Sequence, residues 1–522
     1  MAGKSPAPER RVEVLVIGAG PAGVAAAIEA AAGGAQVLLV DENPAPASLM
    51  GLDVPHYYGG RQTGAGHVRA RLIEQVFKAN PALETAFEAG VDIELGVCCW
   101  GAWVPGYGLA ALPGPLAGLA DEMRAWMVGF DRLILATGAR DVAFAFPGWD
   151  QPGVMGARAL QALIDTYDAF AGRRLAILGA GDLARQTAAL ALDRGLEVVA
   201  LIDIAGGAPG LAAGLAPGVE ILTGHVPVAA SGGVDGVERL TVRDLVTGDE
   251  RTLTCDTVVQ AISLTPVIDL LDVLGARLAM QPTLGGHVPV SPDGAATSLA
   301  EVFIAGDVAG APGGGGVSRK AAEASGRRAG RLVLASLGRA VRGDEPPAPT
   351  DAAADAVALQ QAWTRVLMAS TEDSVILCQC EAVSRASLLG VRPPDYLGPP
   401  SASMAARDLG RLLEDGAASP DQIKRLTRAG MGPCQGRRCR EQVALTLACA
   451  AGRPAAAIAL AGYRPPVRPL PLSVLAAWDE DPIMARHWDV WFGIKGQWTP
   501  YADIGGEREA LYDGLFGGES PL

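Results

Sequence analysis

The sequence has little of what marks a membrane, secreted or nucleic-acid-binding protein. It contains no stretch of about 18 uninterrupted apolar residues, so we expect no membrane span. Residues 1–11 lead into the first strand without an apolar signal region, so we expect no secretory signal and a cytoplasmic protein. Positive charge is also scarce, because 43 Lys and Arg face 57 Asp and Glu, for a net charge of −14. That charge repels phosphate backbones, which excludes nucleic acid and favours small molecules and proteins as partners.

Cysteine and histidine are few as well. Eight cysteines in 522 residues do not form a secreted disulfide framework. None of them makes a C-x2-C or C-x4-C pair near the glycine-rich motifs described below, which argues against a redox-active dithiol beside those motifs. The length predicts three or four domains, and 49% hydrophobic content is ample for their buried cores.

Residues 12–42 read as a buried strand, a glycine-rich turn, a helix and a second strand that ends in acids. This is the dinucleotide fingerprint in its required context, with G-x-G-x-x-G directly after the first strand. The glycines allow a tight turn, close approach of a pyrophosphate and close helix packing, while the acid can bind a ribose. A glycine turn in a nucleotide-free sheet is the alternative. The candidate cofactor-binding residues here are Gly18, Gly20, Pro21, Ala22, Gly23, Asp41 and Glu42.

A second strand–helix–strand unit spans residues 173–203. Gly179 and Gly181 belong to a G-x-G-x-x-A turn, and Asp203 closes the second strand. No Lys or Arg follows directly, so an NADP 2′-phosphate would have no partner and NAD is favoured. A retained fold with an empty or altered site is the alternative.

Four cysteines are paired in the last third of the chain, Cys378 with Cys380 and Cys434 with Cys439. Four thiolates suit a [2Fe–2S] cluster or a structural zinc. The five histidines lie outside the segment between Cys378 and Cys439, which favours iron–sulfur, and nearby glycines free backbone N–H groups to point at cluster sulfurs. Cys98, Cys99, Cys255 and Cys449 lie in apolar segments and read as core residues.

Further motifs carry a family resemblance. The fingerprint, LILATGA and FPGWDQPGVM resemble the two-dinucleotide-binding-domain flavoproteins that include glutathione and thioredoxin reductases. The resemblance implies FAD at the first site, with Thr137 and Gly138 beside it and with Gly306 and Asp307 as the closing motif at the flavin ribitol and phosphates. Arg61, in a GGRQ turn, is a candidate flavin contact because polar donors after small residues suit a flat ring. This turn comes later than is usual in the family, and a solvated loop is the alternative.

The cysteine pairs resemble the bacterioferritin-associated-ferredoxin-like [2Fe–2S] domain, with an insertion between the pairs. The whole order of motifs is similar to the larger flavoprotein subunit of opine oxidases, dye-linked proline and hydroxyproline dehydrogenases, and hydrogen cyanide synthase. The resemblance implies an electron-transfer subunit whose partner, a D-amino-acid-oxidase-like FAD subunit, oxidises the amine. Further candidates are FMN at a subunit interface and a small ferredoxin-like subunit. The other open functions are a self-sufficient NADH-dependent reductase and a non-catalytic scaffold that retains a nucleotide.

The sequence therefore predicts an α/β fold with two Rossmann-like dinucleotide-binding domains of the glutathione-reductase type, a small mainly helical [2Fe–2S] domain and a tail. Four tryptophans in that tail suit a subunit interface or packing on the chain's own surface. The expected segments are residues 1–150 and 269–340 for the FAD domain, 151–268 for the inserted domain, 341–372 for a linker, 373–452 for the [2Fe–2S] domain and 453–522 for the tail.

Overall fold

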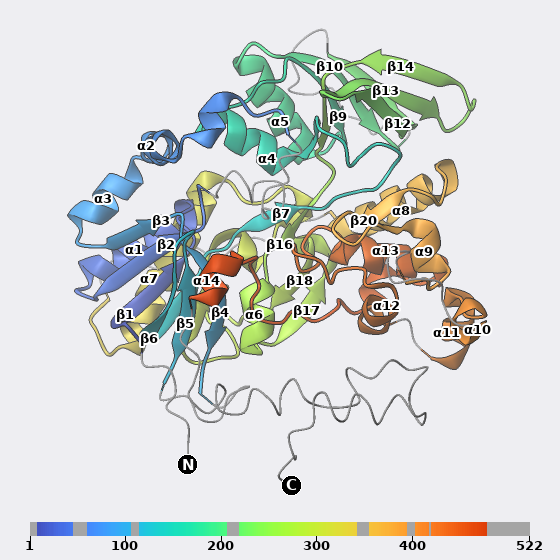
Figure 1. The fold of residues 1–522 in the computed structure, drawn as a ribbon. Coiled ribbons are helices and arrows are strands. Elements are labelled where there is room, and N and C mark those ends of the chain that lie inside the picture. Colours follow the sequence, from blue (N-terminus) through green and yellow to red (C-terminus); the bar gives the residue numbers. More distant parts are fainter. Residues whose placement is uncertain are drawn as a thin grey trace.

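The computed structural model describes residues 8–44, 60–105, 114–205, 219–341, 354–393, 402–416 and 419–477. The tryptophans expected in the tail and most of the loop before Arg61 lie outside these residues. Figure 1 shows two sheets with helices against them and a helical C-terminal region beside both. No helix in the described ranges is long and apolar enough to cross a membrane.

The first sheet has seven strands in the order β3-β2-β1-β6-β5-β4, with β19 paired to β6. Its bounds are β1 (Arg10–Ile17), β2 (Val37–Asp41), β3 (Asp92–Leu95), β4 (Cys98–Trp103), β5 (Leu116–Ala120), β6 (Ala125–Leu135) and β19 (Val302–Ile304). The neighbouring pairs β3–β2, β2–β1, β1–β6 and β6–β19 are parallel. The pairs β6–β5 and β5–β4 are antiparallel. One edge of β6 pairs with β1, and its other edge pairs first with β5 and then with β19.

Three helices lie together beside the first sheet, α1 (Pro21–Ala32), α3 (Ala82–Glu88) and α7 (Arg319–Ser336). Gly326 and Gly330 of α7 face α1 so closely that an added Cβ would lie 2.0 Å from Ala22 O or 2.8 Å from Ala26 O. Such close approach requires glycine. The helix that follows the fingerprint is therefore held by a helix about 300 residues later in the chain.

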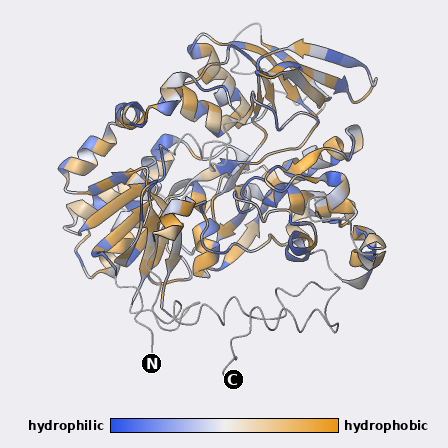
Figure 2. Ribbon diagram, viewed as in Figure 1, coloured by the Kyte–Doolittle hydropathy of each residue, from blue (hydrophilic) through white to orange (hydrophobic). Residues whose placement is uncertain are grey.

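The second sheet is parallel, in the order β11-β10-β9-β15-β8. Its strands are β8 (Val154–Gly156), β9 (Arg174–Leu178), β10 (Glu197–Asp203), β11 (Glu220–Thr223) and β15 (Thr257–Gln260), and α5 (Asp182–Asp193) joins β9 to β10. An antiparallel sheet of β12 (His225–Gly233), β13 (Gly236–Asp244) and β14 (Glu250–Thr254) adjoins it. All these strands lie between β6 and β19 in the sequence. Figure 2 shows that hydrophobic residues dominate the central, parallel strands of the first and second sheets, as expected for strands buried on both faces.

The connection between the two sheets contains β7 (Ala139–Asp141), which pairs with β16 (Leu264–Pro266), and leads into β8; α4 (Ala157–Gln161) and the π-helix η2 (Ala162–Thr166) follow β8. Trp149 in this connection is buried, and its Nε1–H donates to Ile376 O at 2.7 Å. Phe144 packs against Trp363, with ring centroids 6.4 Å apart. The FPGW motif is therefore where the C-terminal region packs onto the connection.

The described C-terminal region is mainly helical. It contains α8 (Ala356–Ser370), α9 (Arg385–Leu389), α10 (Ala402–Ala405), α11 (Leu409–Asp415), α12 (Pro420–Thr427), α13 (Arg440–Ala450) and α14 (Leu472–Ala476), with a hairpin of β20 (Ile376–Cys378) and β21 (Val383–Ser384). The remaining elements are η1 (Gly64–His67), α2 (Arg69–Ala79), α6 (Asp269–Leu274), β17 (Leu278–Gln281), η3 (Pro282–Leu284), β18 (Gly286–Pro289), η4 (Gly306–Ala309), η5 (Pro312–Gly314) and, in the C-terminal region, η7 (Ala455–Ala457). The mixed α/β fold expected from the sequence is confirmed, whereas the exact domain boundaries stay predictions.

Candidate functional site

A cavity of about 430 Å³ lies where β1, β2 and β6 end. Ligands of open α/β sheets bind at this carboxyl edge. Eight of the predicted cofactor-binding residues line the cavity, namely Gly18, Gly20, Pro21, Asp41, Glu42, Thr137, Gly138 and Asp307. Ala22, Gly23 and Gly306 do not line it but pack behind it, since an added Cβ at Gly306 would lie 2.8 Å from Ala22 Cβ.

The three fingerprint glycines have different surroundings. Gly18 has φ +107°, and a Cβ there would lie 2.3 Å from Ala136 O. A Cβ on Gly23 would lie 1.8 Å from Gly18 O, whereas a Cβ on Gly20 would meet no atom within 4 Å. Gly18 and Gly23 therefore serve the fold, and Gly20 leaves open space at the start of α1.

The N-terminus of α1 has no side-chain cap and no acidic residue in its first turn. Its free N–H groups and positive dipole end suit a phosphate. Together with the open space over Gly20 and the size of the cavity, this arrangement fits the pyrophosphate of a dinucleotide.

The two acids at the end of β2 are held by different partners. Asp41 accepts hydrogen bonds from Ala19 N at 2.5 Å and from Asn43 N at 2.7 Å, so each of its carboxylate oxygens holds the turn. Burial raises the pKa of Asp41, and these backbone N–H groups oppose that effect. Glu42 also lines the cavity, and because both of its carboxylate oxygens accept from a single side chain, Arg468, it keeps lone pairs suited to ribose hydroxyls.

The strand ends on the other side of the cavity are fixed by hydrogen bonds. Thr137 Oγ1 donates to Val267 O at 2.8 Å. Asp307 Oδ1 accepts from Val317 N at 2.7 Å, and its Oδ2 lies 3.1 Å from Arg158 Nη2. Burial raises the pKa of Asp307, while Arg158 acts to lower it. Asp307 is therefore held in one orientation at the cavity.

Sequence reasoning missed three cations of this site. Arg158 of α4, Arg319 of α7 and Arg468 near the end of the described chain all line the cavity. Arg158 is paired with Asp307, and Arg468 with Glu42 and with Asp269. They come from elements far apart in sequence, so no local spacing signals them.

Arg61 lies elsewhere. Its guanidinium donates to Asp256 O at 2.8 Å and to Val237 O at 2.9 Å, both in the inserted region. Arg61 is not among the residues that line the cavity, so the structure does not support its expected contact with a flavin ring. It holds its loop to the neighbouring sheet instead.

The second glycine turn repeats the first. Gly179 has φ +108°, and the buried Asp203 accepts from Ala180 N at 2.9 Å and from Ala205 N at 2.8 Å, just as Asp41 holds the first turn. Gly181 has open space around its Cβ position. However, Ile204 stands where Glu42 stands in the first unit, so this turn has the fold of a nucleotide site without the ribose-facing acid.

The four paired cysteines come together as free thiols in two pairs. Within each pair one thiol lowers the pKa of the other: Cys380 lowers the pKa of Cys434 to about 5, and Cys439 lowers that of Cys378. The described residues contain no group of three or more His, Cys, Asp or Glu side chains arranged to hold a metal ion. The donors fit a thiolate-bound centre in type and number.

Glycines surround these sulfurs. Gly430 N lies 3.5 Å from Cys378 Sγ, and the backbone N–H of Gly436 points at Cys434. Gly430 and Gly436 have φ of +84° and +78°, and a Cβ on Gly432 would lie 2.3 Å from Cys380 Cβ. This fits the expectation that glycines free the backbone to donate to sulfur. Cysteines outside the two pairs are held as neutral thiols, because burial raises the pKa of Cys98, Cys99 and Cys255 to about 12.

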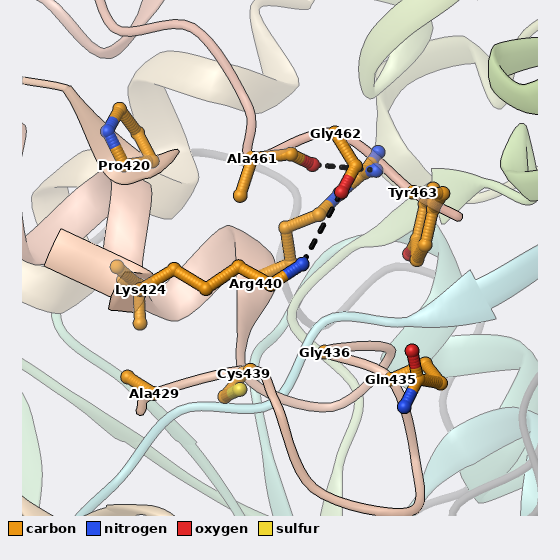
Figure 3. A pocket seen from close by; sticks show the side chains of 12 residues that line it. Pro420, Lys424, Ala429, Gln435, Gly436, Cys439, Arg440, Ala461, Gly462 and Tyr463 are labelled. Atoms are coloured by element: carbon orange, nitrogen blue, oxygen red, sulfur yellow. Dashed lines mark hydrogen bonds between the residues drawn. The ribbon is translucent and has the colours of Figure 1, made fainter. Parts of the chain in front are cut away.

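A small cavity of about 10 Å³, room for one water, lies beside Cys439 (Figure 3). Lys424 Nζ donates to Gly462 O at 3.3 Å, and Arg440 Nη1 donates to Ala461 O at 3.2 Å. Figure 3 shows both side chains reaching the segment that carries these carbonyls. The two cations thus hold this segment against the cysteine loop, and the cavity is too small for an amine substrate.

Comparisons with known proteins agree with this architecture. The family description "Pyridine nucleotide-disulphide oxidoreductase" matches residues 12–327, and "Sarcosine oxidase A3 domain" matches residues 402–479. The second match includes Cys434 and Cys439 but not Cys378 or Cys380.

The chain is 27% identical to an opine oxidase subunit of Agrobacterium tumefaciens, over 89% of this chain and 91% of that protein. It is 26% identical to hydrogen cyanide synthase subunit HcnB of Pseudomonas aeruginosa, over 81% of this chain and 90% of that protein. Its fold resembles the crystal structure of L-proline dehydrogenase from P. horikoshii, with a TM-score of 0.60, 20% identity and coverage of 90% of this chain and 81% of that chain. These relatives confirm the resemblance expected from the motifs. The chain therefore belongs to the pyridine nucleotide-disulphide oxidoreductase family, which confirms the expected oxidoreductase class and indicates FAD as its cofactor.

Proposed function

We propose that this chain is the electron-transfer subunit of a heteromeric amine or amino-acid dehydrogenase or oxidase, and that a partner flavoprotein oxidises the substrate. The relatives support this because they are themselves named as subunits, of opine oxidase and of hydrogen cyanide synthase. The proposed partner is a D-amino-acid-oxidase-like FAD subunit. Further proposed components are FMN at the interface and a small ferredoxin-like subunit.

The proposed cofactors are FAD in the first cavity and a [2Fe–2S] cluster on Cys378, Cys380, Cys434 and Cys439. When bound, FAD supplies two-electron chemistry and the cluster supplies one-electron transfer. Gly20, the α1 N-terminus and Glu42 would hold the phosphates and ribose of FAD. Gly430 and Gly436 would direct N–H groups to the sulfurs.

One observation carries the proposal. The buried Arg437 donates to Cys434 O and to Val467 O, each at 2.9 Å, and the residue that follows Val467, Arg468, lines the FAD cavity. The cysteine loop and the cavity are therefore joined through one arginine and one peptide link. This short route suits electron traffic between the two centres.

The cavity itself offers little to an amine substrate. An amino-acid oxidase anchors the substrate carboxylate with an unpaired Arg fork. All three arginines in the cavity lining are paired with acids of this chain, Arg158 with Asp307, Arg319 with Glu323, and Arg468 with Glu42 and Asp269. This supports substrate oxidation on the partner.

The test compares the isolated chain with the complex purified alongside its untagged neighbours. Both are assayed with opines, proline, hydroxyproline, glycine and sarcosine and a dye acceptor. We expect substrate-dependent dye reduction only from the complex. Dye reduction by the homogeneous isolated chain at a rate comparable to that of the complex would defeat the proposal.

The self-sufficient NADH reductase is the second candidate, because the second glycine turn keeps the geometry of the first. Two observations speak against it: Ile204 replaces the ribose-facing acid, and a Cβ on Gly315 would lie 3.6 Å from Asp182 Cβ, so the loop after η5 lies against the start of α5. Bleaching of the bound flavin by NADH alone would select this candidate. A colourless, iron-free protein would instead favour the nucleotide-retaining scaffold.

A further inference from the structure

Residues 460–468, here called the return segment, run from the cysteine-bearing region back to the first sheet. Tyr463 N donates to Asp272 Oδ2 at 2.8 Å, and Val467 N donates to Trp100 O of β4 at 2.8 Å. Tyr463 and Val467 are buried in the same hydrophobic cluster as residues of β1, β4 and β6. The return segment is thus built into the core of the first sheet.

Arg468, at the end of the return segment, connects that core to the cavity. It lines the cavity and donates to both oxygens of Glu42 and, through Nη1, to Asp269 Oδ2 at 3.0 Å. Only 8% of Arg468 is exposed, and Asp269 is 1% exposed. Arg468 therefore balances the charge of Glu42 and, together with Arg140, that of the buried Asp269.

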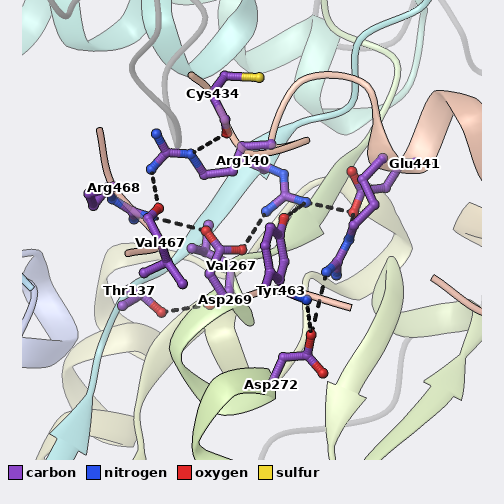
Figure 4. A network of polar contacts seen from close by, with 12 residues as sticks. Thr137, Arg140, Val267, Asp269, Asp272, Cys434, Glu441, Tyr463, Val467 and Arg468 are labelled. Carbon is purple, nitrogen blue, oxygen red and sulfur yellow. Dashed lines mark hydrogen bonds and ion pairs between the residues drawn. The ribbon is translucent and has the colours of Figure 1, made fainter. Parts of the chain in front are cut away.

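The other side of the same network reaches the cysteine loop (Figure 4). Arg437, 2% exposed, bridges Cys434 O and Val467 O. Arg140 lies 3.2 Å from Asp269 and 2.6 Å from Glu441, which is in the first turn of the helix that follows Cys439. Figure 4 shows these side chains meeting around Asp269 and Tyr463.

We propose that Arg468 is a dinucleotide-site residue supplied by the C-terminal region, and that through it nucleotide binding and docking of the cysteine-bearing region stabilise each other. Glu42 is the acid in the cavity suited to ribose, and Arg468 fixes where its carboxylate lies. A bound dinucleotide displaces water from the cavity, which strengthens the Arg468 ion pairs by lowering the local dielectric. Because coupling between two equilibria is reciprocal, a docked return segment favours the nucleotide to the same degree. The inference concerns binding alone and is independent of the amine substrate.

The test measures two quantities in the full chain. The first is the dissociation constant of FAD, measured by flavin fluorescence after reversible removal of the cofactor. The second is hydrogen–deuterium exchange of residues 460–468 with and without FAD. Arg468→Gln removes the proposed link, and Arg464→Gln is the matched control because Arg464 lies on the same segment but is exposed.

We expect Arg468→Gln to weaken FAD binding on the order of tenfold, within the range usual for coupled sites. FAD should slow exchange of residues 460–468 in the parent and in Arg464→Gln, but not in Arg468→Gln. Arg468→Lys should retain part of both effects, since it keeps the charge but loses the fork.

A second variant keeps the inference testable if Arg468→Gln does not fold. The double variant Glu42→Gln/Arg468→Gln removes the Glu42 carboxylate together with its cation, so it should fold better than Arg468→Gln. It should still bind FAD weakly and show no FAD-dependent protection of the return segment. FAD affinity equal to the parent in either variant, or equal FAD-dependent protection, would overturn the inference.

Discussion

Arg158 Nη2 and Asp307 Oδ2 lie 3.1 Å apart at the wall of the first cavity, although the two residues are 149 positions apart in sequence. The pair joins α4, which follows the connection between the sheets, to the closing motif of the first sheet. It balances the charge of a mostly buried acid beside the place where phosphates are expected.

Loss of Arg158 should therefore weaken FAD binding. We expect Arg158→Gln to raise the dissociation constant of FAD about tenfold or more, since hydrogen bonds to charged groups are worth roughly 1.5–3 kcal/mol. Arg185→Gln is the control, because Arg185 is paired with Asp182 on the second unit. Fluorescence titration of both apo-proteins measures the effect, and an unchanged constant for Arg158→Gln would contradict it.

The open space over Gly20 gives a second prediction. Gly20→Ala should leave the fold stable, because its Cβ meets no atom within 4 Å, yet should reduce FAD binding, because the Cβ lies where a pyrophosphate must approach. Gly181→Ala is the matched change in the second unit, with equally open space. FAD released from denatured protein should fall at least tenfold only for Gly20→Ala. If only ATP or AMP is recovered from the parent protein, the FAD assignment is wrong.

The two cysteine pairs give a third prediction. Cys434→Ser should remove the visible iron–sulfur absorption and roughly two irons per chain. Cys449→Ser is the control, because Cys449 lies on α13 outside both pairs. Iron analysis and absorption of anaerobically purified protein provide the measurement. Stoichiometric zinc without iron would refute the cluster.

Asp141 gives a prediction about pH. Its Oδ1 accepts from Arg158 N at 3.0 Å, its Oδ2 has no partner, and burial raises its pKa to about 7. The folded state therefore binds more protons than the unfolded state between pH about 4 and 7, so this group lowers stability as pH rises through that range, by up to about 1.4 kcal/mol per pH unit.

Asp141→Asn should accordingly raise the free energy of unfolding at pH 8, with a gain that shrinks towards pH 4. Asparagine keeps an acceptor for Arg158 N, so the local structure is retained. Thermal unfolding at pH 5 and pH 8 measures the difference, with the exposed Asp150→Asn as control. A stability gain that is equal at both pH values would show that the carboxylate is not the cause.

Prediction from sequence succeeded where the signal was local. The strand, turn and helix around Gly18 and Gly20 form one continuous pattern, and the strand ends at Thr137 and Asp307 reach the same cavity. It failed to show how the two acids are held, because Asp41 accepts from backbone N–H groups of the turn whereas Glu42 accepts from Arg468, far away in the sequence.

It also failed for residues that tertiary packing brings in. Arg468 lies in a proline-rich stretch without periodicity, and only the path of the return segment brings it to Glu42. The residues around Arg61 in the sequence predict a contact with the flavin ring. Its guanidinium donates instead to the backbone carbonyls of Asp256 and Val237.

The pairing of β6 with β19 sets the order in which the first sheet can be completed during synthesis of the chain. The edge that pairs with β19 stays open until residues 302–304 have left the ribosome, after the whole second sheet has emerged. An unpaired edge is a site for wrong association, and long-range parallel pairing forms slowly. The first sheet is therefore completed only after the whole inserted region has been synthesised.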